Sequence, residues 1–110
     1  MNLVTYVPLH RKTLKERGFN HLREILVHIF PSYMIREVVE KVRDTQLQMN
    51  LTRADRIINL KGAFRLSGNV KGKRVLVFDD IMTTGTTMLH MYKTIKKGRP
   101  EKIFGYLIGR

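Results

Sequence analysis

Two adjacent carboxylates, Asp79 and Asp80, stand shortly before a hydroxyl-rich loop, Thr83 to Thr87, with Gly85 at its centre. The backbone N–H groups of such a loop can surround an anion, because a glycine there permits a positive φ. Two carboxylates repel a phosphate, so Asp79 and Asp80 suit a diol or a divalent cation bound beside the anion. A sugar phosphate offers both groups, a phosphate for the loop and a diol for the two carboxylates. The spacing matches neither a Walker loop nor a dinucleotide-binding loop.

The elements around this segment predict how it is held. Val75 to Phe78 is a continuous apolar run, typical of a strand covered on both faces. Apolar residues at helical spacing follow from Thr87 to Lys97, and Ile103 to Ile108 predicts a second buried strand. The order strand, helix, strand favours an α/β fold with a parallel sheet flanked by helices. The loop would then lie at the carboxyl edge of the sheet, where ligands bind.

The first part of the chain predicts a strand, a loop and two helices. Leu3 to Pro8 has the pattern of a short strand, and the basic stretch from His10 to Asn20 is expected to be a loop closed by Gly18. A helix is predicted from Asn20 to Phe30, and a second one, capped by Ser32, carries an apolar stripe as far as Val42.

The net charge of the chain indicates that its partner is negatively charged. The 110 residues include 21 Lys and Arg against 9 Asp and Glu, and the formal net charge of +12 favours phosphates or nucleic acid. The length suits one domain. No apolar run is long enough to cross a bilayer, so we expect no membrane insertion. With no cysteine in the sequence, disulfide scaffolds, zinc ribbons and thiol catalysis are excluded, and we expect a cytoplasmic protein.

Two groups of cations are candidate contacts for an anionic ligand, although each is also compatible with ordinary surface charge. The first group precedes Gly18 and consists of Arg11, Lys12, Lys15 and Arg17. The second group is Arg43, Arg53 and Arg56, in and beside a weakly periodic stretch, Asp44 to Asn69, that we expect to be an ordered connection with a mobile part. The histidines lack the spacing of a metal site, so we predict no protein metal centre; they are His10, His21, His28 and His90.

The stretch VLVFDDIMTTGTT resembles the phosphoribosyl pyrophosphate (PRPP) binding motif of type I phosphoribosyltransferases. Two earlier blocks make the wider sequence similar to the competence protein ComF branch of that superfamily. They are VPLHRK followed by RGFN, and RDTQLQMNLTRADRIINLKGAF. The resemblance covers almost the whole chain; the acidic pair indicates the superfamily, and the earlier blocks indicate the branch.

The resemblance implies a type I phosphoribosyltransferase-like fold and a role for each motif. Asp79 and Asp80 would contact the ribose hydroxyls of PRPP and are the candidate catalytic residues, and Mg²⁺ would accompany PRPP as cofactor. The 5-phosphate would be held by Thr83, Thr84, Gly85, Thr86 and Thr87. The pyrophosphate, or DNA, would meet Arg11, Lys12, Lys15 and Arg17. The flexible region over the site would run from Arg43 to Phe64 and include Arg53 and Arg56.

The chain departs from the family pattern at its start. Members of the branch have an upstream segment with a four-cysteine zinc module, whereas this sequence begins at the strand before VPLH. We therefore expect residues 1–110 to be one phosphoribosyltransferase-like domain of a longer protein, incomplete at the N-terminus.

Three functions remain open. The first is a PRPP-binding protein that serves DNA uptake in natural transformation, with single-stranded DNA and other competence proteins of the uptake machinery as partners. The second is a nucleobase phosphoribosyltransferase, in which a base attacks the anomeric carbon as pyrophosphate leaves. The third is a basic module that binds single-stranded DNA through phosphates alone. Such a module has no need of the acidic pair, and only Phe19 and Phe64 offer an aromatic ring within a basic loop.

Overall fold

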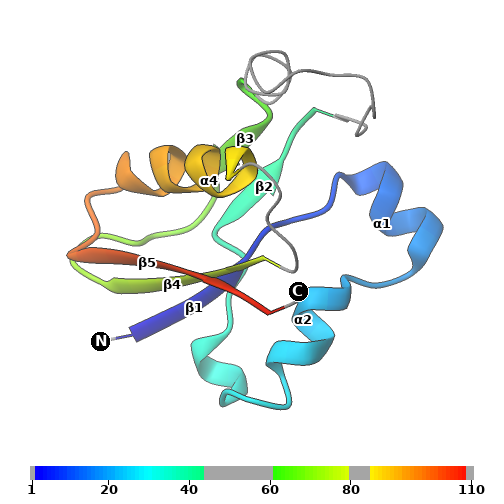
Figure 1. Ribbon diagram of the computed structural model, residues 1–110, viewed down its shortest axis with the longest axis horizontal. Helices are drawn as coiled ribbons and strands as arrows, with labels where there is room; N and C mark the ends of the chain where they lie inside the picture. The colour runs from blue at the N-terminus through cyan, green and yellow to red at the C-terminus, as the bar shows by residue number, and fades with distance from the viewer. Residues whose placement is uncertain (1, 44–60, 80–84, 109–110) are drawn as a thin grey trace.

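The centre of the molecule is a three-stranded parallel sheet with the strand order β1-β4-β5. A computed structural model of the chain describes residues 2–43, 61–79 and 85–108 (Figure 1). The strands are β1 (Asn2–Tyr6), β4 (Arg74–Asp79) and β5 (Lys102–Leu107). Tyr6 pairs with Phe78, and Asp79 pairs with Leu107, so all three strands finish at one edge. The predicted α/β fold with a parallel sheet is confirmed.

One face of the sheet is covered by the helix α4 (Thr86–Lys96) together with a two-stranded antiparallel sheet. That small sheet is formed by β2 (Val39–Lys41) and β3 (Phe64–Leu66). A fully buried core joins these elements; it includes Val39, Val75, Val77, Met91 and Ile95. Among the helices that the structure describes, none is long and apolar enough to cross a membrane.

Among the described residues, the opposite face is covered over β1 and partly over β4, and it is left open over β5. The helix α2 (His21–Leu26) and the 3-10 turn η1 (Ser32–Met34) lie there, with Val4 and Leu26 completely buried between them. In the parallel register Phe104 lies beside Leu76, which pairs with Val4, and therefore points to this same face. Phe104 is 40% exposed and Tyr106 is 44% exposed. The strand predicted at Ile103–Ile108 is present, but the prediction that it is buried is wrong.

The structure corrects two predictions for the first third of the chain. The basic stretch predicted as a loop contains a helix, α1 (Arg11–Arg17), which ends at Gly18 with a φ of 84°. The second helix predicted from Ser32 to Val42 is wrong as well. A single 3-10 turn forms at Ser32, and Val39 to Lys41 join β3, since pairing Val39 with Leu66 buries the valine completely.

The helix predicted from Asn20 is shorter than its apolar pattern. It is regular from His21 to Leu26 and ends in turns before Pro31. Most of the connection predicted from Asp44 to Asn69 lies outside the described residues, but its last part contains β3.

Candidate functional site

The carboxyl ends of the three central strands bring the predicted chemistry together. The N–H of Val7 donates to the carbonyl of Phe78 at 3.0 Å, and the N–H of Ile108 donates to that of Asp79 at 2.9 Å. The segments that follow β1, β4 and β5 therefore start side by side. Asp79 is the last residue of β4 and is only 9% exposed. A carboxylate is held at the ligand-binding edge of a parallel sheet.

Gly85 begins the helix that follows this edge. It has a φ of 77° and a ψ of 1°, a left-handed conformation, so the positive φ predicted for it is confirmed. Thr86 is buried and Thr87 is partly buried in the first turn of α4. The first N–H groups of an α-helix have no partner within the helix and carry its positive dipole end. Asp80, Thr83 and Thr84 lie outside the described residues.

The segment after β1 is fixed by caps at both ends of α1. The Nδ1 of His10 accepts the N–H of Lys12 at 3.2 Å, and the N–H of Gly18 donates to the carbonyl of Leu14 at 2.7 Å. Asn20 caps the following helix, because its Oδ1 accepts the N–H of Leu22 at 2.9 Å. Its amide group also donates to the carbonyl of Val7 at 3.4 Å. The α1 segment is thus tied to the end of β1.

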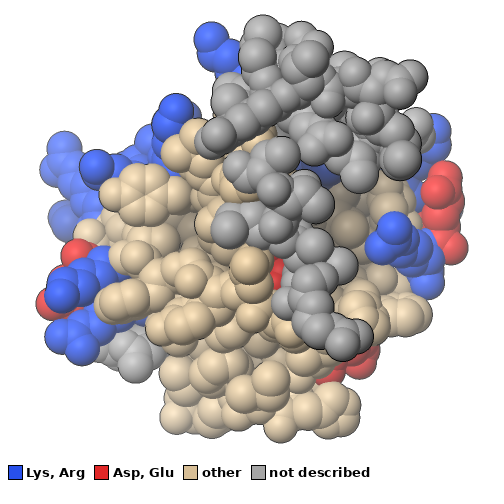
Figure 2. Space-filling model, in the orientation of Figure 1, with Lys and Arg blue, Asp and Glu red and all other residues tan. Residues whose placement is uncertain are grey.

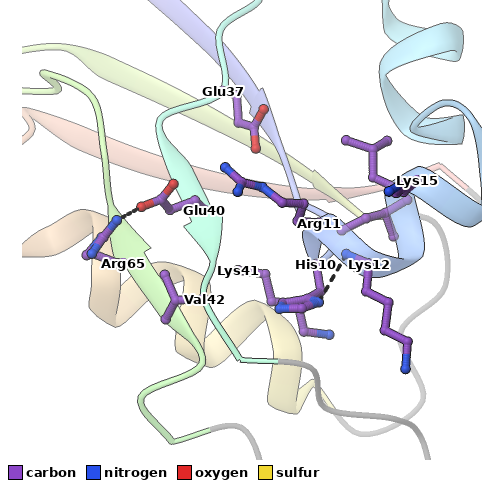
Figure 3. Close-up of a pocket in the computed structure, with 11 residues that line it drawn as sticks. His10, Arg11, Lys12, Lys15, Glu37, Glu40, Lys41, Val42 and Arg65 are labelled. Carbon is purple, nitrogen blue, oxygen red and sulfur yellow. Dashed lines mark hydrogen bonds and ion pairs between the residues drawn. The ribbon is translucent and has the colours of Figure 1, made fainter.

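A pocket of about 680 Å³ lies between α1 and the β2–β3 pair (Figure 3). We call it the α1 pocket. Its lining holds five cations and two carboxylates: Arg11, Lys12, Lys15, Lys41, Arg65, Glu37 and Glu40. Lys41 is brought to α1 by a bridge between its backbone and that of His10. Figure 2 shows that Lys and Arg also gather at the far end of the molecule, where α4 ends and β5 begins.

The two carboxylates reduce the positive charge of the α1 pocket. Glu40 forms a salt bridge with Arg65 across the β2–β3 pair. Figure 3 shows Arg11 extending its guanidinium toward Glu37, whereas Lys12 points away from both acids. Desolvation by surrounding groups raises the pKa of Glu37, and the positive charge of Arg23 partly opposes that rise. The pocket remains cationic in sum, which suits a phosphate-bearing ligand.

The structure brings together some of the predicted contacts and separates others. Arg11, Lys12 and Lys15 line the α1 pocket, and Arg17, on the same helix, does not. Arg43 donates to the carbonyl of Lys61 and so joins the two sides of the connection after β2. Arg53 and Arg56 lie outside the described residues.

Two cations of the pocket were not found from the sequence. Lys41 and Arg65 stand on strands far apart in the chain, and only the pairing of β2 with β3 places them opposite α1. No local pattern in the sequence indicates that pairing. Within the described residues no group of three His, Asp or Glu side chains is arranged to hold a metal ion.

The sequence of the chain is similar to those of known proteins. The family of the phosphoribosyl transferase domain matches residues 24–106. Competence protein F of Haemophilus influenzae is 32% identical over 103 residues, which cover 88% of this chain and 45% of that protein. The DNA utilization protein YhgH of Escherichia coli strain K12 and that of Salmonella typhi are each 35% identical over 88 residues, covering 77% of this chain and 39% of those proteins.

The chain thus spans less than half the length of the curated relatives it matches. No solved structure matches it. The predicted resemblance to the competence-protein branch is confirmed by these relatives.

Proposed function

Because the chain belongs to the phosphoribosyl transferase domain family, we propose that it binds PRPP at the carboxyl edge of β4. The ribose hydroxyls are bound by Asp79 and Asp80, and the 5-phosphate is held by the loop from Thr83 to Thr87. The observation that carries this proposal is the left-handed Gly85 at the start of α4, a few residues after the buried Asp79. A left-handed residue directly before a helix lets successive backbone N–H groups converge on an anion.

The acidic pair and the loop together favour a sugar phosphate over a simple phosphate as the ligand. A carboxylate accepts hydrogen bonds from a diol, and it repels a phosphate that comes too close. Asp79 is held at the strand end by the pairing of β4 with both neighbours, so its position is fixed before the ligand arrives. Mg²⁺ prefers carboxylate and phosphate oxygens, and this donor set fits an ion that enters with the pyrophosphate. It would neutralise charge there.

We also propose that the α1 pocket contacts the phosphates of single-stranded DNA, and that the protein serves DNA uptake. The relatives called competence protein F and DNA utilization protein support this role by their names. The pocket supports it by chemistry, since cations from α1, β2 and β3 face one space. Of these cations, Arg11, Lys12 and Lys15 follow β1 closely in the chain and would also meet the pyrophosphate of PRPP, so PRPP and DNA compete in part.

Calorimetric titration with PRPP and Mg²⁺ tests the first proposal. The wild type binds, and the double variant Asp79→Ala, Asp80→Ala loses measurable binding. A matched control is Glu101→Ala, which removes an exposed carboxylate beside Arg74 at the opposite edge of the sheet and leaves PRPP affinity unchanged. Unchanged PRPP affinity in a folded double variant would contradict the proposal.

A further inference from the structure

A second pocket, of about 270 Å³, lies on the other side of α1, between it and α2. We call it the α2 pocket. Its apolar wall is formed by Leu9, Leu14 and Phe19. Phe19 is 50% exposed, which is a large area for an aromatic ring in a described segment with fixed ends. The cap at Gly18 and the cap at Asn20 hold its backbone on both sides.

The rest of the lining can form hydrogen bonds. Tyr6, at the end of β1, is only 4% exposed, and Arg23 lies close enough to interact with its hydroxyl. Desolvation by burial, reinforced by the negative charge of Glu37, raises the pKa of Tyr6, so it remains a neutral donor. Arg23 has further donors on its guanidinium, and Glu37 has carboxylate acceptors. The α2 pocket therefore combines a flat apolar ring, a donor and an acceptor.

The two pockets are neighbours. Leu9, Leu14 and Glu37 line both of them, so a ligand can extend from one to the other past the same three side chains. The cations Arg11, Lys12 and Lys15 belong to the α1 pocket alone. Arg23 belongs to the α2 pocket alone. A charged part of a ligand and an uncharged planar part thus have separate places.

We propose that the α2 pocket receives one unstacked nucleobase of a single strand whose phosphates lie in the α1 pocket. The inference rests on the DNA-binding part of the proposed function. A base stacks on the ring of Phe19, its N–H groups donate to Glu37, and its carbonyl or ring nitrogen accepts from Arg23. Two carboxylates, Glu24 and Glu37, line this pocket against one cation, Arg23, so they would repel a phosphate there and a neutral heterocycle is the better occupant.

Fluorescence titration at one low salt concentration tests the inference with two oligonucleotides of equal length. One carries all its bases, and the other is abasic at its central positions. The wild type binds the intact oligonucleotide about tenfold more tightly, the size expected for one stacked base. Phe19→Ala removes this advantage and leaves the affinity for the abasic oligonucleotide unchanged. Glu37→Ala reduces the advantage and keeps the ring.

Two controls separate the base from the backbone and from surface hydrophobicity. Tyr33→Ala removes another aromatic side chain, 75% exposed on η1 and outside both pockets, and leaves both affinities unchanged. Lys12→Ala with Lys15→Ala weakens both oligonucleotides by the same factor, since these cations meet phosphates.

Three results would overturn the inference, and they differ from one another. If the wild type binds both oligonucleotides with equal affinity, phosphate binding still stands, but binding of a base in the α2 pocket is excluded. If the wild type binds neither oligonucleotide, both the DNA-binding part of the proposed function and the binding of a base are excluded. A free nucleobase that binds the wild type and not Phe19→Ala, with both oligonucleotides equal, shows that the pocket takes a free base and not one in a strand. Titration with PRPP, run in parallel, reports on the β4 edge independently.

Discussion

At the scale of single residues, the backbone of Gly85 is the most restrictive feature of the proposed PRPP site. Its φ of 77° lies in a region that a β-branched residue enters only with strain. We expect Gly85→Val to lose PRPP binding while the free energy of unfolding falls by only about 1–3 kcal/mol. Calorimetry with PRPP and urea unfolding measure the two quantities.

Gly72→Val is the matched control for that experiment. Gly72 also has a positive φ, 70°, but it is exposed and lies in the turn before β4, at the opposite edge of the sheet. The strain is similar, and PRPP affinity should persist. Equal losses of PRPP affinity in both variants would show that the effect at Gly85 is general destabilisation.

Glu37 gives a pH-dependent prediction. Its folded-state pKa is raised above the ordinary value of 4.5 by desolvation, with Arg23 opposing the shift. The unfolded state therefore loses this proton first as the pH rises, and the folded state is destabilised relative to it across that window. Above the folded pKa the penalty is complete, and below 4.5 it is absent.

Replacing Glu37 by Gln removes that penalty. We expect Glu37→Gln to be more stable than the wild type at neutral pH, with the difference vanishing at about pH 3.5. Urea unfolding at the two pH values measures it. Glu24→Gln, a change of an exposed carboxylate on α2, is the control. A difference between wild type and Glu37→Gln that is independent of pH would exclude the ionisation of Glu37 as its cause.

At the scale of elements, α1 carries its cations on a helix with no buried residue. Each phosphate contact on single-stranded DNA contributes about −0.7 to the slope of log affinity against log salt. We expect the slope to flatten by about 2 when the four cations of α1 are replaced by alanine, because Arg17 does not line the α1 pocket. Fluorescence titration over a range of salt concentrations measures the slope.

A matched variant removes four exposed lysines around the other end of the molecule; they are Lys71, Lys93, Lys97 and Lys102. Its net charge equals that of the α1 variant, so a non-specific charge effect would flatten both slopes alike. A slope that is unaltered in the α1 variant would place the DNA contact elsewhere.

The elements also show how far the sequence could be interpreted. The bounds of β4 and α4 were predicted nearly to the residue, because an apolar run and a helical stripe can each be recognised without long-range help. The helix α1 was missed since it buries nothing and so has no apolar stripe. Val38, Val39 and Val42 have helical spacing, but pairing with β3 decides their conformation.

The candidate site also has a part that could be predicted from the sequence and a part that could not. The β4 edge is a continuous motif, so the residues from Asp79 to Thr87 could be proposed as candidates from the sequence, and the structure describes Asp79 and Gly85 to Thr87 among them. The α1 pocket and the α2 pocket are assembled from three or more segments, and their shared residues Leu9, Leu14 and Glu37 carry no motif. Arg23 and Glu37 meet only because α2 and the segment before β2 pack beside the same strand, β1.

At the scale of the whole molecule, the charge is distributed around an apolar surface. Figure 2 shows Lys and Arg at both ends of the viewed face and a broad area of other residues between them. The strand β5 exposes Phe104 and Tyr106 beside the partly buried Leu76 and Phe78 of β4. Tyr106 and Phe78 stack at 5.3 Å between ring centroids, so the rings form one continuous patch.

This arrangement has a consequence for how the isolated chain behaves in concentrated solution. The net charge of +12 keeps molecules apart by repulsion, and salt screens that repulsion while leaving apolar attraction intact. Adding salt should therefore cause this chain to self-associate through β5, the edge strand of the described sheet that carries the exposed rings. Light scattering should rise with sodium chloride for the wild type and much less for Phe104→Lys. Association that weakens as salt is added would show that charge pairing holds the molecules together.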